Sequence, residues 1–250
     1  MNFLVGERPT LTCMIQARTP ERIFELIEKG ISGGADAFGL QLEQLERQYH
    51  TKEIYCELFK AMGDKPCYVT NYSIAMNKGI TYEELADELV TVAECGGALI
   101  DIFGDIFDRQ PDQITYDDDA VKKQEELIEK IHYIGKEVLI STHTYRFMEY
   151  DDVFKILSAH KKRGADVAKI VTAANSEYEL KTNFEITSEL SKKLGIPYLF
   201  LCGGSYCSKH RRIAPLISDD MFLCVAEYDE LSTPAQPLLR DAKKIIELIG

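Results

Sequence analysis

The chain contains no hydrophobic run long enough to cross a membrane. Its longest apolar stretches are Ile196–Cys202 and Met221–Ala226, far below the roughly 20 residues that a membrane-spanning helix needs. The first residues, Met-Asn-Phe-Leu-Val-Gly-Glu-Arg, reach charged side chains too early for the apolar core of a signal peptide. We therefore expect a soluble protein that stays in the cytoplasm.

Positive charge is also scarce. The 250 residues include 29 lysines and arginines against 41 aspartates and glutamates, which gives a formal net charge of −12. Such a field repels polyphosphates and anionic lipids, so it disfavours nucleic acid or a membrane surface as a partner. Glycine and proline number only 16 and 8, and 45% of the residues are hydrophobic, which excludes a disordered chain. The length is typical of one large α/β domain, expected over residues 1–250.

Two motifs are missing. The seven cysteines contain no C-x-x-C pair, and we expect all of them to be reduced in a cytosolic protein. A zinc site built from Cys202, Cys207 and His210 has irregular spacing and is a minor alternative. No Gly-x-Gly-x-x-Gly follows the first expected strand, which argues against a dinucleotide-binding fold. Four cysteines fall inside apolar runs, where buried thiols are common: Cys13, Cys67, Cys202 and Cys224.

A repeated unit organises the chain. The segments Gly34–Asp36, Gly97–Leu99 and Gly164–Asp166 each stand between a helical pattern and an apolar run. Because glycine just past a helix end adopts the left-handed cap, each segment predicts a helix-turn-strand unit. Eight runs rich in Val, Ile, Phe and Tyr predict strands: Thr10–Gln16, Ala37–Leu42, Pro66–Tyr72, Ala98–Phe103, Glu137–His143, Asp166–Val171, Pro197–Cys202 and Met221–Ala226. Eight strands alternating with amphipathic helices predict a single (β/α)8 TIM barrel, with an open doubly wound sheet as the weaker alternative.

One lysine and one histidine stand out at the expected mouth of this barrel, where catalytic side chains gather at the carboxyl ends of the strands. Lys169 lies in the middle of an apolar strand, where a buried ammonium is costly. Either a neighbouring carboxylate pairs with it, or burial lowers its pKa and leaves a neutral amine that can form an imine with a ketone. His143 ends the preceding strand and could move protons beside that imine. For His143 alone, a core histidine bonded to a backbone carbonyl is the alternative.

Four segments carry a family resemblance. Ile140–Thr144, Gly164–Ile170, Ser208–Ile213 and Ser232–Gln236 resemble motifs of type I 3-dehydroquinate dehydratases, and their order and separations also fit. The similarity spans nearly the whole chain. The resemblance implies a (β/α)8 barrel that needs no metal or organic cofactor and usually forms a homodimer. It also implies a small-molecule substrate, because the family dehydrates 3-dehydroquinate to 3-dehydroshikimate through a lysine imine.

Individual roles follow from the same resemblance. By position, Lys169 is similar to the lysine that forms the imine, and His143 is similar to the general acid and base. Arg212 resembles the arginine that holds the substrate carboxylate, and a guanidinium suits bidentate capture of such a group. Ser232 and Gln236 resemble residues of a lid loop that closes over the substrate.

The first half of the chain departs from the family pattern. The Glu-x-Arg of the family's second strand is replaced by Gly39–Gln41, and the arginine of its third strand by Tyr72. Phe103 stands where the family has the glutamate that orients the histidine, so we expect Asp101 or Asp105 to orient it instead. Gln41, Tyr72 and Asp101 are expected to bind substrate through hydrogen bonds where the family uses salt bridges. The predicted substrate is therefore 3-dehydroquinate or a related, less charged cyclic keto-polyol.

Two other classes of function stay open at this point. A metal-dependent barrel could use Asp101, His143 and Glu227, although their spacing is irregular. A non-catalytic ligand-binding barrel is permitted by the lost charges. The acidic run Asp117–Asp119 is typical of a helix start, with a metal site as the minor alternative. The longest irregular connection, Asp105–Ile114, is expected to shape the entrance of the barrel.

Overall fold

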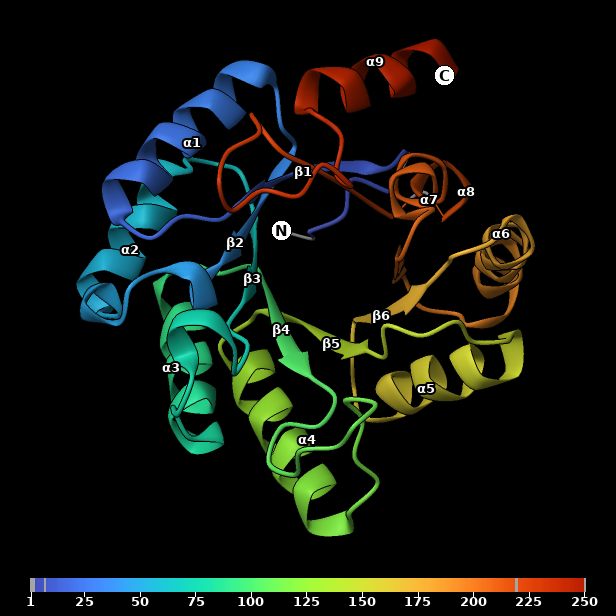
Figure 1. Cartoon of the computed structure of the whole chain (residues 1–250). Coiled ribbons are helices and arrows are strands. Elements are labelled where there is room, and N and C mark those ends of the chain that lie inside the picture. The colour runs from blue at the N-terminus through green and yellow to red at the C-terminus, as the bar shows by residue number, and fades with distance from the viewer. Residues whose placement is uncertain (1–2, 7, 219, 250) are drawn as a thin grey trace.

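Eight parallel strands form a nearly closed barrel in the computed structural model, which describes residues 3–6, 8–218 and 220–249 (Figure 1). The strands pair in the order β7-β6-β5-β4-β3-β2-β1-β8. The two end strands, β7 and β8, are connected near their first residues by a hydrogen bond in which Tyr198 N donates to Asp220 Oδ2 at 3.0 Å. The strands are β1 Thr10–Ile15, β2 Ala37–Gln41, β3 Cys67–Thr70, β4 Leu99–Phe103, β5 Glu137–His143, β6 Val167–Ala173, β7 Tyr198–Gly203 and β8 Met221–Cys224. The predicted TIM barrel is confirmed, and the open-sheet alternative is wrong.

Helices cover the outside of the barrel (Figure 1). They are α1 Pro20–Gly33, α2 Lys52–Ala61, α3 Tyr82–Cys95, α4 Asp118–Tyr133, α5 Tyr150–Lys162, α6 Glu177–Lys193, α7 Cys207–Ile213, α8 Pro215–Ser218 and α9 Leu239–Ile249, with short 3-10 turns η1 Leu42–Gln44, η2 Arg47–Tyr49 and η3 Ala75–Asn77. Helix α1 shows the predicted unit. Thr19 caps its start by accepting from Arg22 N, and Gly34 ends it at φ 79°, where a side chain would be strained.

One end of the barrel is closed by an apolar layer. Met14, Tyr68 and Leu99 are among its buried members, and Phe3 packs edge-on against Tyr68 with ring centroids 6.4 Å apart. Gly39 shares this layer. A Cβ at Gly39 would lie 2.2 Å from Met14 Sδ and 3.3 Å from the Tyr68 ring. A larger side chain at this position would require the flexible Met14 side chain to move, because its neighbours already fill the space.

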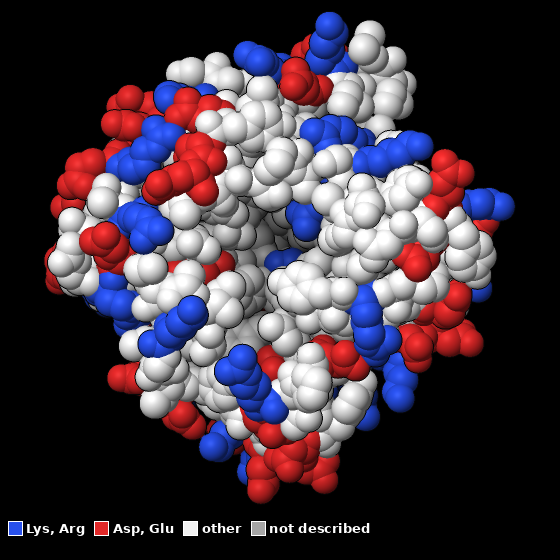
Figure 2. Space-filling view, viewed as in Figure 1, with Lys and Arg blue, Asp and Glu red and all other residues white. Residues whose placement is uncertain are grey.

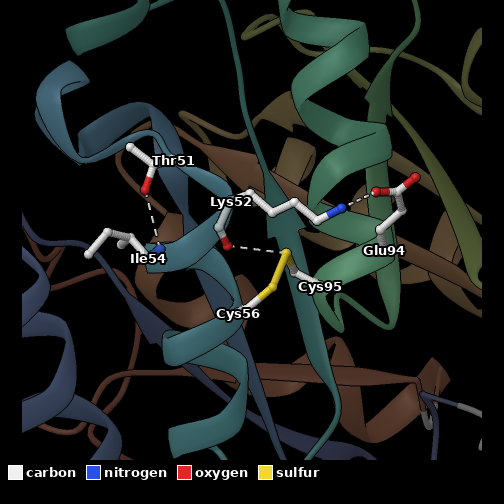
Figure 3. Close-up of a disulfide and its surroundings, with 6 residues drawn as sticks. All are labelled: Thr51, Lys52, Ile54, Cys56, Glu94 and Cys95. Carbon is white, nitrogen blue, oxygen red and sulfur yellow. Dashed lines mark hydrogen bonds and ion pairs between the residues drawn. A yellow bond between two sulfur atoms is a disulfide. The ribbon is translucent and has the colours of Figure 1, made fainter.

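A disulfide between Cys56 and Cys95 corrects the prediction that all cysteines are reduced (Figure 3). It joins α2 to α3, with the two Cα atoms 4.6 Å apart. The ion pair of Lys52 Nζ with Glu94 Oε2, at 2.8 Å, bridges the same two helices. The sequence could not reveal the pairing because 39 residues separate the two cysteines. The four cysteines predicted to be buried thiols are buried and free: Cys13, Cys67, Cys202 and Cys224.

None of the three metal alternatives gains support. In the described ranges, no group of three His, Cys, Asp or Glu side chains is placed to hold a metal ion. His210 instead stacks on Phe184 with ring centroids 5.5 Å apart, and Glu227 is bridged by Arg22 and Lys29. No described helix is both long enough and apolar enough to span a bilayer.

Candidate active site

Lys169 is paired with a buried carboxylate inside the barrel. Strand register places it beside Ser141 of β5, and its side chain is 6% exposed. The ammonium Nζ donates to Asp101 Oδ2 at 3.1 Å, to the Tyr72 hydroxyl at 2.7 Å and to the Tyr68 hydroxyl at 2.8 Å. The alternative of an unpaired amine is therefore wrong, and the pairing with a neighbouring carboxylate is what the fold contains.

Asp101 is the centre of this buried network. Its Oδ2 accepts from the hydroxyls of Tyr68 and Tyr72, the latter at 2.5 Å, and its Oδ1 accepts from Ser141 Oγ at 2.5 Å. Burial, and then the charge of Asp101, raise the pKa of both tyrosines well above the usual range, so both phenols stay protonated. Asp101 is fully buried. It holds Lys169 and its neighbours, and its contact with substrate stays a prediction.

His143, at the end of β5, is oriented by Gln113. Its Nδ1 lies 2.8 Å from Gln113 Oε1. An amide oxygen only accepts, so the ring proton sits on Nδ1 and Nε2 keeps its lone pair. Burial, followed by the positive charges of Lys169 and Arg211, lowers the pKa of His143 well below its ordinary value. The imidazole is therefore a neutral base. The prediction that Asp101 or Asp105 orients this ring is wrong.

The loop that carries Gln113 is held by hydrogen bonds from Thr142 and Arg163. The Gln113 carbonyl accepts from Thr142 Oγ1 at 3.0 Å. The buried guanidinium of Arg163, at the end of α5, donates to the Gly104 carbonyl at 3.2 Å and to Gln124 Oε1 at 3.0 Å. Gln113 itself has φ 49°, a conformation that is uncommon for residues other than glycine. These contacts fix the amide that holds His143.

A cavity of about 130 Å³ opens beside His143. Its walls are largely aromatic and include Tyr72, Tyr82, Phe103 and Tyr145. Tyr72 meets the imidazole edge-on with ring centroids 5.1 Å apart, and the two-thirds-exposed Tyr145 stacks on it at 5.8 Å. Five of the residues that line this cavity also line a second hollow of about 410 Å³: Asp105, Arg109, Gln113, His143 and Tyr145. As predicted, the Asp105–Ile114 connection shapes this entrance. Figure 2 shows a central hollow on the face viewed in Figure 1, with basic side chains inside it.

The predicted lid residues lie in the loop after β8. Arg212 Nη1 donates to the Ala235 carbonyl at 3.1 Å, so the arginine holds this loop. The Ser232 hydroxyl donates to the Asp229 carbonyl at 3.1 Å within a tight turn. Gln236 is 3% exposed, and its Oε1 has no hydrogen-bond partner among the described residues. Arg212 therefore contacts the predicted lid segment, whereas the Ser232 hydroxyl is bonded within the loop itself.

Two polar groups lie at the end of β2. Gln41 accepts from Gln16 Nε2 at 2.5 Å, so the predicted substrate ligand is engaged by a neighbouring strand. Glu43, in η1, is 1% exposed, and its carboxylate accepts from Thr70 Oγ1 at 2.8 Å. Burial raises the pKa of Glu43 to about 7. This carboxyl is the second buried acid of the mouth.

Sequence reasoning missed three residues of the site. Tyr68 could have been found, because it lies four residues before Tyr72 and alternation puts both on one face of a strand. Glu43 follows a predicted strand end, which was a weaker signal. Gln113 gave none, because its partner is 30 residues away and its loop has no regular periodicity.

Comparisons with known proteins identify the family and support the fold. A sequence model described as type I 3-dehydroquinase matches residues 13–250. A search of curated proteins finds no match. The type I 3-dehydroquinate dehydratase of Clostridium difficile, solved with covalently modified comenic acid, has a TM-score of 0.83 and 16% identity, covering 98% of this chain and 94% of its own. The enzyme of Geobacillus kaustophilus HTA426 has a TM-score of 0.83 and 14% identity, over 98% and 93%. That of Enterococcus faecalis has a TM-score of 0.73 and 16% identity, over 97% and 94%.

Proposed function

Because the chain belongs to the type I 3-dehydroquinase family, a family of hydro-lyases, we propose that it dehydrates a cyclic β-hydroxyketone through an imine on Lys169. The first candidate substrate is 3-dehydroquinate, which would give 3-dehydroshikimate. The observation that carries the proposal is the placement of Lys169 and His143 on the neighbouring strands β6 and β5, with Tyr72 in contact with both side chains.

The chemistry assigns one step to each group. The Lys169 amine adds to the ketone carbon, and loss of water gives an iminium, which withdraws electrons from the adjacent carbon. His143 Nε2 removes a proton from that carbon and returns it to the departing β-hydroxyl, which leaves as water. The hydrogen bond from Nδ1 to Gln113 keeps Nε2 unprotonated and ready to accept, and the lowered pKa keeps the ring neutral before the reaction.

The loop after β8 completes the proposed site. Arg212 would hold the substrate carboxylate while its contact with the Ala235 carbonyl links that ligand to closure of the loop. Gln236 Oε1, buried and without a partner among the described residues, would accept a hydrogen bond from a substrate hydroxyl. Ser232 would act by shaping the turn that it already stabilises.

A second candidate is a related cyclic keto-polyol that carries less charge. It is favoured by the aromatic wall at Tyr72 and Phe103 and by the close packing around Gly39, since these are positions where the family has charged groups. Gln41 and Tyr72 would offer hydrogen bonds to hydroxyls there. This candidate uses the same imine and the same histidine.

The proposal also covers assembly and location. We place the enzyme in the cytoplasm as one barrel domain over residues 1–250, acting as a homodimer without a metal or organic cofactor. The disulfide of Cys56 with Cys95 argues against a cytoplasmic location, because disulfides are rare in reducing compartments. Counting free thiols in protein isolated under non-reducing conditions from the source cells tests it.

Borohydride trapping tests the chemistry. The protein is mixed with 3-dehydroquinate, or with cyclic β-hydroxyketones that lack a carboxylate, then reduced and weighed by mass spectrometry. We expect a covalent adduct that is absent in Lys169→Ala and retained in Lys162→Ala, which removes an exposed lysine. Formation of the conjugated enone absorbance identifies the dehydrated product.

The outcomes separate the candidates. An adduct and enone absorbance from 3-dehydroquinate support the first substrate, whereas an adduct only with the uncharged ketones assigns the second. Failure of every ketone to modify Lys169 in the folded protein would leave a non-catalytic barrel and overturn the proposal.

A further inference from the structure

The ammonium of Lys169 is saturated with acceptors. Three oxygens surround Nζ within 3.1 Å, those of Tyr68, Tyr72 and Asp101, and an ammonium has three protons to donate. An amine can attack a ketone only after it gives up one of these protons. The only anion among the three partners is Asp101. Asp101 is therefore the group within the network that can accept the proton from Lys169.

The two tyrosines of this network differ in what else they contact. Tyr68 is 1% exposed and packs against Phe3 at the closed end of the barrel. Tyr72 lines the cavity that contains His143 and meets the imidazole edge-on. Its hydroxyl touches Lys169 Nζ at 2.7 Å, Asp101 Oδ2 at 2.5 Å and Ser141 Oγ at 3.2 Å. Of the three partners of Lys169 Nζ, only Tyr72 also lines the cavity that contains His143.

We propose that Tyr72 is a catalytic residue, which relays protons between Lys169 Nζ, Asp101 and the substrate oxygen while the imine forms. The inference rests on the proposed imine chemistry and assigns Tyr72 a step that a substrate-binding residue would not perform.

The relay balances at each step. Lys169 passes a proton to the Tyr72 oxygen as Tyr72 passes its own to Asp101, which leaves a neutral amine and a neutral carboxyl. The amine adds to the ketone, and its nitrogen passes one proton to the new alkoxide oxygen, which gives a neutral carbinolamine. That oxygen then takes a second proton from Asp101 through Tyr72. The C–O bond breaks and water leaves. The products are a positive iminium and a negative Asp101, so the buried site carries the same charge before and after.

The surroundings suit a relay. Asp101 keeps hydrogen bonds from Ser141 and Tyr68 throughout, which hold its carboxyl in place while it gains and loses the proton. Burial, and then the charge of Asp101, raise the pKa of Tyr72 well above its usual range, so Tyr72 gives a proton only as it receives another. His143 is left free for the proton on the neighbouring carbon.

A matched pair of variants tests this relay. Tyr72→Phe and Tyr68→Phe each remove one hydroxyl that contacts both Lys169 and Asp101. The single-turnover rate of imine formation with 3-dehydroquinate is followed by cyanoborohydride trapping and mass spectrometry. We expect Tyr72→Phe to slow the rate about a hundredfold or more, and Tyr68→Phe to slow it less than tenfold. A merely structural network would respond equally to both changes.

The wild-type protein provides a measurement that needs no variant. Imine formation should be slower in heavy water than in light water, because several protons move in the step; equal rates would overturn the relay, even if Tyr72→Phe fails to fold. Adduct formation by Tyr72→Phe at the wild-type rate would also overturn the relay while leaving the Lys169 imine intact. No adduct with wild-type protein and any ketone would overturn both the proposed function and this inference.

Discussion

The two halves of the barrel divide the work of the site. Strands β5 to β8 and their loops carry the predicted reacting and lid groups, Lys169, His143 and Arg212. Strands β1 to β4 and their loops supply what surrounds them, above all Asp101 and Gln113. The family's charged side chains are missing from this first half, yet Asp101 and Gln113 in this half hold both reacting groups. The comparison shows that the second half can keep the reacting residues while the first half positions them through other contacts.

The supports differ in kind. Lys169 is held by a buried ion pair with Asp101, whose removal leaves an uncompensated charge. His143 is held by a neutral amide, whose removal leaves a ring free to change its tautomer. Loss of the first support should therefore lower stability most, whereas loss of the second should lower catalysis with little change in stability.

The largest effect is expected from Asp101→Asn. The substitution would leave the buried Lys169 side chain without its counter-ion, and breaking a buried pair in this way costs about 3–5 kcal/mol of unfolding free energy. Denaturant unfolding measures it. The double variant Lys169→Met with Asp101→Asn should recover most of the loss. A loss below about 1 kcal/mol for the single change would show that the first half does not hold Lys169 by charge.

Glu43→Gln should stabilise the protein at alkaline pH. The folded state keeps this carboxyl protonated up to a pKa of about 7, whereas the unfolded chain ionises it near 4.5. Stability from the wild-type carboxyl is therefore lost as pH rises between those values. At pH 8 the substitution should add roughly 3 kcal/mol, and below pH 4 almost nothing.

Denaturant unfolding at both pH values checks this expectation. Glu57→Gln, which changes an exposed glutamate on α2, is the matched control and should alter stability little at either pH. A gain that is the same at pH 4 and pH 8 would contradict the assignment of a raised pKa to Glu43.

Gln113→Ala should slow turnover with little change in stability. Loss of the acceptor at Nδ1 frees the imidazole to protonate at either nitrogen, and removal of such a partner typically lowers activity 10–100-fold, or about 1.4–2.7 kcal/mol. Gln113→Glu should instead favour the imidazolium, raise the pKa of His143 and move the acid limb of kcat/KM to higher pH.

The control for this loop is Gln110→Ala. Gln110 lies three residues away and its amide bonds Asp108 rather than the histidine, so activity should change less than threefold. Nitrogen-15 chemical shifts of the His143 ring report the tautomer directly. An unchanged tautomer in Gln113→Ala would show that the second half orients its own histidine.

The smallest effect is expected from Gly39→Ala. The new Cβ would stand 2.2 Å from Met14 Sδ, so the flexible methionine must move, at a cost of about 1–2 kcal/mol. Gly203→Ala on β7 is the matched control, since its Cβ would meet nothing closer than 3.7 Å. Thermal unfolding compares the two. An equal, near-zero cost for both would show that the first half has room for the family's charged side chain.

Several elements were predictable because their causes are local. The glycine after α1 marked a helix end through its backbone freedom, and the alternation of residues put Lys169 inside the barrel. Other features depended on contacts distant in sequence. Lys169 and Asp101 are 68 residues apart. Neither strand contains a sequence signal that identifies the other, so the partners of the Lys169 side chain could not be predicted.

The sequence alone determined the eight alternating units and the strand ends on which Lys169 and His143 stand, because turn glycines and apolar periodicity act over a few residues. Tertiary structure alone decided that Asp101 neutralises the lysine, that Gln113 orients the histidine and that Cys56 meets Cys95. The physical reason is that charge pairing, hydrogen bonding and disulfide formation depend on distances in space, which only closure of the barrel establishes.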